Sequence, residues 1–248
     1  GGGLDEFWDA IRRHPRLMGG ALWDFVNPAL TERIRPLTDS SPYKTPVHLM
    51  SNAKVENGVL HLSGHDEWVE VYRSRNVELN GKALTISFDV KPGKLSGTHE
   101  GAAYITKGNT QFGVVQKGSD KLQFYLHSGV KHTLDVDLPA NWMGNWHHVT
   151  ASWDSKEMKL YIDGELKGTE TTAPQASNNN GRRGNQSGER GVLSNFPYPI
   201  NIGRFAGNHA QDPQTIYTAD AEMDNVAIYD KCLADGEDRR FAGFPFFR

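Results

Sequence analysis

From about residue 58 onward, apolar residues recur at every second position in a series of short runs. A period of two is typical of a β-strand that turns one face toward a core. The apolar positions that share a face are Leu60 and Leu62; Val69 and Val71; Leu84, Ile86, Phe88 and Val90; Leu122, Phe124 and Leu126; Val149, Ala151 and Trp153; Met158, Leu160 and Ile162. Turn-forming pairs separate these runs, and Asp163-Gly164 is a strong signal for a two-residue hairpin. The pattern predicts an all-β fold, a two-sheet antiparallel jelly-roll sandwich.

The first thirty residues follow another pattern. Residues 4–13 read as a helix, because Phe7 and Ile11 lie four positions apart, and Pro15 would end it. The nearly continuous apolar run over 17–26 suits a strand that is buried on both faces, as in a parallel sheet. A helix, a short turn and a buried strand make one step of an α/β barrel, so we expect a short barrel remnant here.

The change in pattern divides the chain into four parts. We expect a barrel remnant over 1–30, a proline-containing linker over 31–57, the sandwich over 58–242, and the start of a following segment at 243–248. A long polar loop within 171–195, rich in Gly and Asn, interrupts the sandwich; loops of that length usually carry a function or move.

Charge and cysteine content narrow the function classes. The formal net charge is −3, which gives no basic footprint for nucleic acid. Cys232 is the one cysteine, so the chain cannot form an internal disulfide or a cysteine zinc site. No run of about 18 apolar residues occurs, so we expect no membrane partner.

Two stretches resemble known families. In the first, Phe7-Trp8-Asp9-Ala10-Ile11, then His14-Pro15-Arg16-Leu17-Met18-Gly19-Gly20, then Trp23-Asp24-Phe25-Val26 resemble the end of the barrel in glycoside hydrolase family 2, the β-galactosidase family. Family members carry Trp-Asp-Trp-Val-Asp or a close variant, so Asn27 departs from the pattern.

The second stretch covers residues 58–242 and resembles the laminin-G-like, concanavalin A-like jelly roll. The motifs that carry the resemblance are Gly58-Val59-Leu60-His61-Leu62-Ser63-Gly64, Phe88-Asp89-Val90-Lys91-Pro92, Asn145-Trp146-His147-His148-Val149, Leu160-Tyr161-Ile162-Asp163-Gly164, Asn201-Ile202-Gly203-Arg204 and Met223-Asp224-Asn225-Val226-Ala227-Ile228-Tyr229. Such modules occur after the barrel in some family 2 glycosidases.

These resemblances imply a non-catalytic accessory module of a family 2 enzyme, secreted or periplasmic in bacteria. Retaining glycosidases need two carboxylic acids about 5 Å apart, and the family's catalytic glutamates would precede this chain, so we expect no hydrolase activity from the chain alone. Its partners would be an oligo- or polysaccharide and the remainder of the parent glycosidase, with structural support of the active-site cleft as a further role. Three alternatives stay open: part of a glycosidase that is active only at full length, a hydrolase in its own right, and a protein-binding laminin-G-like domain.

Sugar-binding residues should be exposed aromatic or polar side chains on an outer face of the sandwich. The strand alternation and the resemblance give six candidates: Trp68, Tyr72, Tyr125, His127, Trp146 and, on the barrel remnant, Trp23. The competing interpretation is that these side chains pack under loops or against the linker.

Asp224 is the main candidate for a metal ligand. The alternation places it on the same face as Val226 and Ile228, which should meet the core, and an inward carboxylate is costly unless it is paired or bound to a metal. The resemblance implies a structural Ca²⁺ with oxygen ligands, to which Asp66 would contribute. A hydrogen bond or a salt bridge is the alternative. The adjacent His147 and His148 should point to opposite faces, which excludes joint chelation of one ion.

Overall fold

The computed structural model describes residues 13, 34–72, 77–95, 101–108, 110–172, 191–194, 198–205 and 217–233. The chain divides into two compact units, Gly1–Glu32 and Arg33–Arg248. The predicted barrel helix and strand, and Trp23, lie outside the described residues, as do most of the loop within 171–195 and the segment at 243–248. The second unit is therefore the part described below.

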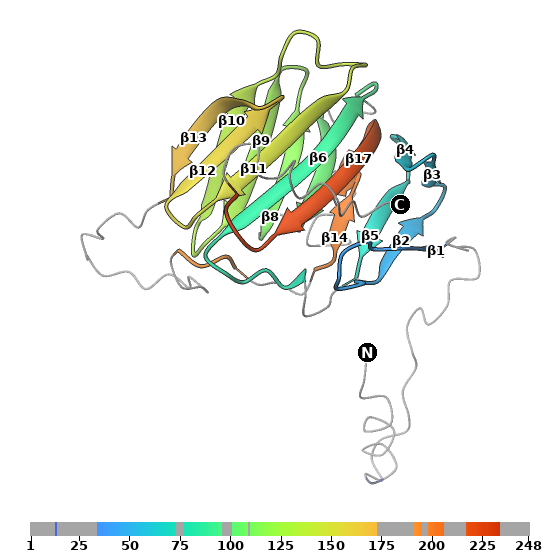
Figure 1. Cartoon of the computed structure of the whole chain (residues 1–248), viewed down its shortest axis with the longest axis horizontal. Helices are drawn as coiled ribbons and strands as arrows, with labels where there is room; N and C mark the ends of the chain where they lie inside the picture. Colours follow the sequence, from blue (N-terminus) through green and yellow to red (C-terminus); the bar gives the residue numbers. More distant parts are fainter. Residues whose placement is uncertain are drawn as a thin grey trace. The chain divides into compact units, whose positions relative to one another are not determined.

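The described part of the second unit is an all-β sandwich of two antiparallel sheets, as the period-two pattern predicted (Figure 1). The eight-stranded sheet has the order β1 (Ile34–Leu37), β2 (Val47–Met50), β5 (Trp68–Val71), β14 (Ile200–Ile202), β7 (Gly101–Lys107), β8 (Phe112–Lys117), β9 (Lys121–His127) and β10 (Lys131–Asp137). The seven-stranded sheet has the order β13 (Glu165–Thr171), β12 (Glu157–Ile162), β11 (His147–Trp153), β6 (Leu84–Pro92), β17 (Asp220–Tyr229), β4 (Val59–Ser63) and β3 (Lys54–Glu56). A short pair, β15 (Arg204–Phe205) and β16 (Tyr217–Thr218), completes the described strands.

The core lies between the two sheets and contains the apolar residues that the alternation placed on inward faces. Leu60, Phe88 and Val149 are fully buried from one sheet, and Leu122 and Phe124 from the other. Removal of this apolar surface from water is the main driving force for the fold. Among the described residues no helix is long and apolar enough to cross a membrane.

The predicted linker needs a correction. Residues 31–57 include β1, β2 and β3, which extend the edges of both sheets. These strands have only three or four residues each, Pro36 lies within β1 and Pro46 directly precedes β2, so the alternation is too short to distinguish them from a connector. In β2, Val47 and Leu49 are buried and supply that alternation.

The Asp163-Gly164 hairpin is confirmed. Asp163 has a φ of 56° and Gly164 a φ of 81°, the pair of left-handed conformations that a two-residue turn of this hand requires. The turn joins β12 to β13 and places the Asp163 carboxylate beside the start of β11, where the backbone N–H of His148 donates to it at 2.9 Å.

A β-bulge in β17 changes the expected orientation of Asp224. The register between β17 and β6 runs Asp224 opposite Asp89 and then Ala227 opposite Ser87, so β17 holds one extra residue. Consequently Met223 and Val226, three residues apart, are both fully buried. Asp224 therefore lies on the outer face with Asp89, and the prediction that it turns inward with Val226 is wrong, because strict alternation does not survive a bulge.

One buried polar network ties a loop to the core. The Gln116 side-chain oxygen accepts from the Tyr104 hydroxyl at 2.6 Å and from the Trp142 indole N–H at 2.9 Å. All three side chains are almost fully buried, and burial raises the pKa of Tyr104. A donor left unpaired in such a site costs about 1–3 kcal/mol.

We therefore expect Gln116→Met to lower the free energy of unfolding by about 2–5 kcal/mol, since it removes the acceptor of two buried donors. Gln123→Met is the matched control: Gln123 is also buried, but it donates to the part-exposed Asp135 at 2.7 Å, so its loss should cost less. Urea unfolding of both variants measures the difference. Equal destabilisation would contradict a special role for Gln116.

Candidate functional site

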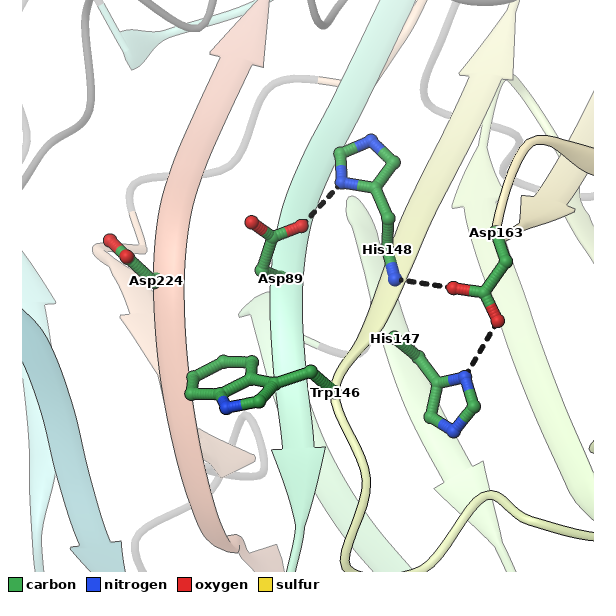
Figure 2. Close-up of a pocket in the computed structure, with 6 residues that line it drawn as sticks. All are labelled: Asp89, Trp146, His147, His148, Asp163 and Asp224. Carbon is green, nitrogen blue, oxygen red and sulfur yellow. Dashed lines mark hydrogen bonds and ion pairs between the residues drawn. The ribbon is translucent and has the colours of Figure 1, made fainter.

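A pocket of about 330 Å³ opens on the outer face of the seven-stranded sheet (Figure 2). Six described residues line it: Asp89, Trp146, His147, His148, Asp163 and Asp224. They come from β6, β11, β17, the hairpin turn after β12 and the loop that enters β11.

Strand register brings three of these side chains into one row. His148 on β11 lies opposite Asp89 on β6, and Asp89 lies opposite Asp224 on β17. Residues directly opposite each other on antiparallel strands have Cβ atoms about 5 Å apart, so the side chains of such a row are neighbours. Because Phe88 and Val90 fill the core, Asp89 must point outward.

Asp89 is held by contacts to both of its carboxylate oxygens. The Nδ1 atom of His148 lies 2.5 Å from Oδ1, and the Asn225 side-chain amide donates to Oδ2 at 2.7 Å. The carboxylate is an acceptor, so Nδ1 of His148 carries a proton. The other ring nitrogen of His148 lies 3.2 Å from the Thr150 hydroxyl and 3.4 Å from that of Ser87. These contacts fix the orientation of Asp89 and His148.

His147 points the other way, as predicted for adjacent strand residues. It is 3% exposed and stacks on Trp142, with ring centroids 4.8 Å apart. Its Nδ1 atom lies 2.7 Å from an Asp163 carboxylate oxygen, and Nε2 lies 3.2 Å from the Asn141 carbonyl. Both ring nitrogens of His147 are thus engaged by oxygen atoms of the protein. His147 therefore anchors Asp163 and does not present a free nitrogen to a ligand.

Several contacts perturb the Asp163 carboxyl. Partial burial disfavours its charge, but the hydrogen bonds from His147 and from the backbone of His148, with the charges of these histidines, outweigh burial and lower its pKa. Asp163 consequently stays ionised to a lower pH than an ordinary aspartate.

Trp146 supplies the apolar wall of the pocket. Its side chain is 44% exposed, and Figure 2 shows the indole reaching across β6 toward β17, below Asp89 and Asp224 in the view. A hydrogen bond holds the loop before Trp146 in place, because the Gly144 N–H donates to the Pro92 carbonyl at 2.7 Å. Gly144 itself adopts a φ of 76°, which favours glycine in this turn. An exposed indole on an anchored loop offers a preformed flat surface.

The other predicted sugar residues lie elsewhere. Trp68 is 7% exposed with the Arg204 guanidinium 4.1 Å from its ring centre, and Tyr125 is 3% exposed with its hydroxyl bound to the Gly108 carbonyl at 2.6 Å. The competing interpretation of these residues as packing therefore describes their surroundings better.

The side chains of Tyr72 and His127 are partly exposed, between the buried Trp68 and Tyr125 and the more exposed Trp146. Tyr72 is 36% exposed and meets the His48 ring edge-on at 4.7 Å. His127 is half-buried, and its Nδ1 lies 2.9 Å from the Ser194 hydroxyl. Burial and the nearby Lys131 lower the pKa of His127, so its ring is neutral near pH 7. Neither residue is among those that line the pocket around Trp146.

Asp89 and Asp163 were not among the predicted site residues. The signal for Asp89 was present, since it stands between the core residues Phe88 and Val90 and must face outward. What the sequence did not show was the pairing of β6 with β17, which brings Asp89 opposite Asp224.

The described residues do not assemble the predicted calcium site. Asp224 lies on the outer face of β17, and Asp66, just before β5, accepts from the Ser51 hydroxyl at 2.8 Å. Within the described part of the chain, no group of three or more His, Cys, Asp or Glu side chains could hold a metal ion. A bound calcium ion therefore stays a prediction.

If calcium stabilises the fold, the melting temperature should fall on addition of EDTA and recover when calcium is added back.

The chain belongs to the concanavalin A-like lectin/glucanases superfamily, whose Laminin_G_3 model matches residues 63–237. This confirms the laminin-G-like jelly roll expected from the sequence.

Among solved structures, the fold is similar to that of the botulinum neurotoxin serotype G binding domain, with a TM-score of 0.60 and 14% sequence identity over 84% of this chain and 50% of that one. It is also similar to the serotype D ligand binding domain in complex with N-acetylneuraminic acid, with a TM-score of 0.59 and 17% identity over 83% of this chain and 49% of that one. The chain thus spans about half of each neurotoxin domain. At this level of identity the likeness shows the shared fold.

Two curated relatives match a short segment. A β-galactosidase of Enterobacter cloacae is 56% identical over 32 residues, and β-galactosidase 2 of the same organism is 53% identical over 32 residues. Each match spans 13% of this chain and 3% of the relative.

The lowered pKa of Asp163 predicts a pH-dependent contribution to stability. A carboxyl whose pKa is depressed by folding stabilises the protein above its ordinary pKa of about 3.9, and this contribution is lost as the pH falls through the lower, folded value. We therefore expect Asp163→Asn, which keeps a residue suited to the turn, to be less stable than wild type at neutral pH. The difference in unfolding free energy should shrink below about pH 4. A difference that stays constant down to about pH 2 would contradict this assignment.

Proposed function

We propose that this chain is a non-catalytic, carbohydrate-binding accessory module of a family 2 glycoside hydrolase. The observation that carries the proposal is the exposed Trp146 indole beside Asp89 and Asp224 in one open pocket. The membership in a lectin and glucanase superfamily is consistent with it.

The pocket has the chemistry that sugar recognition needs. A pyranose presents an apolar face of C–H groups and an edge of hydroxyl groups. An exposed indole can take the apolar face, and carboxylate oxygens can accept hydrogen bonds from the hydroxyls. Asp89 and His148 are already fixed by their neighbours, so little side-chain entropy would be lost when a sugar binds.

The parent enzyme is inferred from the short β-galactosidase matches together with the resemblance of residues 4–30 to the end of a family 2 barrel. The aligned segment is a small part of those relatives, so the parent's substrate stays open. A module beside such a barrel would hold a glycan near the active site or shape its cleft.

The opposed carboxylates Asp89 and Asp224 raise a second candidate, a hydrolase in its own right, since two acids are the minimum for glycoside cleavage. The contacts of Asp89 argue against this role. Both of its oxygens are engaged by the His148 ring and the Asn225 amide. Turnover of a chromogenic galactoside by the purified chain would nevertheless favour the enzyme.

The binding test is a glycan array followed by titration of the best neutral ligand. We expect Trp146→Ala to weaken binding at least tenfold, about 1.4 kcal/mol, because the apolar wall of the pocket is lost. Tyr43→Ala is the matched control, since Tyr43 is 68% exposed and does not line the pocket.

Equal affinity of the two variants would place the site elsewhere. Tyr72→Ala then becomes the next variant, because Tyr72 is a partly exposed aromatic residue directly after β5, a strand of the other sheet. Binding of no glycan by the folded wild-type chain would leave only the structural role.

A further inference from the structure

We propose that Asn145 is a positioning residue for the candidate glycan site, because its side-chain amide holds the loop over 141–146 in the conformation that presents the Trp146 indole. This inference rests on the proposed carbohydrate-binding function and names a residue that acts on the same pocket through Trp146. Asn145 is not among the described residues that line the pocket.

The Trp146 indole depends on this loop for its position. Within the described part of the chain, the indole takes part in no hydrogen bond, ring stacking or cation–π contact. Figure 2 shows it projecting from the loop that enters β11 and reaching across β6. The pairing of β11 with β6 begins only at the next residue, His147, which lies opposite Val90. The backbone before His147 therefore decides where the ring lies.

Asn145 closes the turn that directly precedes Trp146. Its side-chain amide donates to the Asn141 carbonyl at 2.8 Å and to the Met143 carbonyl at 3.3 Å. Both partners are acceptors, so the amide nitrogen faces them and the side chain acts as a donor. One side chain thus connects the start and the middle of the turn to the residue before the indole.

The base of the loop is held separately. Trp142 and His147 are buried and stack with ring centroids 4.8 Å apart, and the Gly144 N–H donates to the Pro92 carbonyl at 2.7 Å. Asn145 is exposed, so its replacement leaves these anchors in place. Substitutions at such positions usually change the stability of the fold little. The conformation of the turn can therefore change while the sandwich stays folded.

Order in the loop should contribute directly to affinity. A loop that is ordered before the ligand arrives binds more tightly, because the binding energy need not offset the entropy of ordering. When the competent conformation is only partly populated, the apparent affinity falls by that fraction, and the loss of one ordinary hydrogen bond shifts such a population about fivefold. Asn145→Ala should therefore weaken glycan binding about fivefold, while the melting temperature falls by no more than about 4 °C.

A second variant and a matched control make the test specific. Asn145→Asp keeps the size and the turn preference of the side chain but cannot donate to the two carbonyls, so it should weaken binding at least as much as Asn145→Ala. Asn141→Ala is the control, because Asn141 is also an exposed asparagine of this loop and the turn uses its backbone carbonyl, which alanine keeps. Isothermal titration with the neutral oligosaccharide that binds best on the glycan array measures the affinities.

A measurement without ligand separates positioning from a purely structural role. Nitrogen-15 relaxation of the free protein reports the order of the backbone N–H groups from Met143 to Trp146 and of the Trp146 indole N–H. Backbone order parameters should be about 0.85 in the wild type, as in a rigid segment, and fall toward about 0.6 in Asn145→Ala. The indole should become more mobile with them. Asn141→Ala should keep the wild-type values.

The outcomes separate this inference from the proposed function. Unchanged affinity of Asn145→Ala would overturn the inference and keep the function, provided that Trp146→Ala still weakens binding. Weaker binding with unchanged order parameters would also contradict it, because Asn145 would then act on the ligand directly. Equal effects of Asn141→Ala would show that any change in the loop matters, which overturns the assignment to Asn145.

If the folded wild-type chain binds no glycan, the proposed function fails and the relaxation data decide the remaining claim. Lower order parameters confined to Asn145→Ala and Asn145→Asp would support Asn145 as the residue that holds the Trp146 loop. Wild-type order parameters in both variants would overturn it.

Discussion

The pairing of β6 with β11 on one side and β17 on the other is the constraint on which the rest of the site depends. β6 is bonded to both neighbours along almost its whole length, so the alternation of its residues fixes two surfaces at once. Phe88 and Val90 fill the core, and Asp89 between them is forced toward water. The same strand pairing thus fills the core with Phe88 and Val90 and places Asp89 in the candidate pocket.

The bulge in β17 is the second determinant. One extra residue lets Met223 and Val226 both reach the core, and leaves Asp224 beside Asp89 on the outer face. Asn225, at the bulge with a φ of 50°, turns its amide onto Asp89. Bulges often redirect side chains next to functional sites, and this one both orients Asp89 and exposes a second acid.

The sequence predicted the fold well and the site only partly. Alternating runs and the Asp163-Gly164 turn define strands locally, and they led to the sandwich and its core. Trp146 and Asp224 were singled out for different reasons, as a sugar residue and as a metal ligand, and the structure places both in one pocket. The sequence could not show this, because strand order and the bulge are long-range features. The same limit explains why Trp68 and Tyr125 were predicted to be exposed. The strand alternation placed both side chains on an outer face correctly, but the neighbouring strand sequence does not show which distant segments cover that face.

The most direct test of the central claim, that a ligand stacks on the indole of Trp146, is nuclear magnetic resonance of the six tryptophan indole N–H groups during titration with the oligosaccharide that binds best on the glycan array. The account predicts that the Trp146 signal shifts with saturation, while those of the buried Trp142 and Trp153 stay in place. Saturable shifts confined to Trp68, or none at Trp146 while binding is detected by calorimetry, would contradict it.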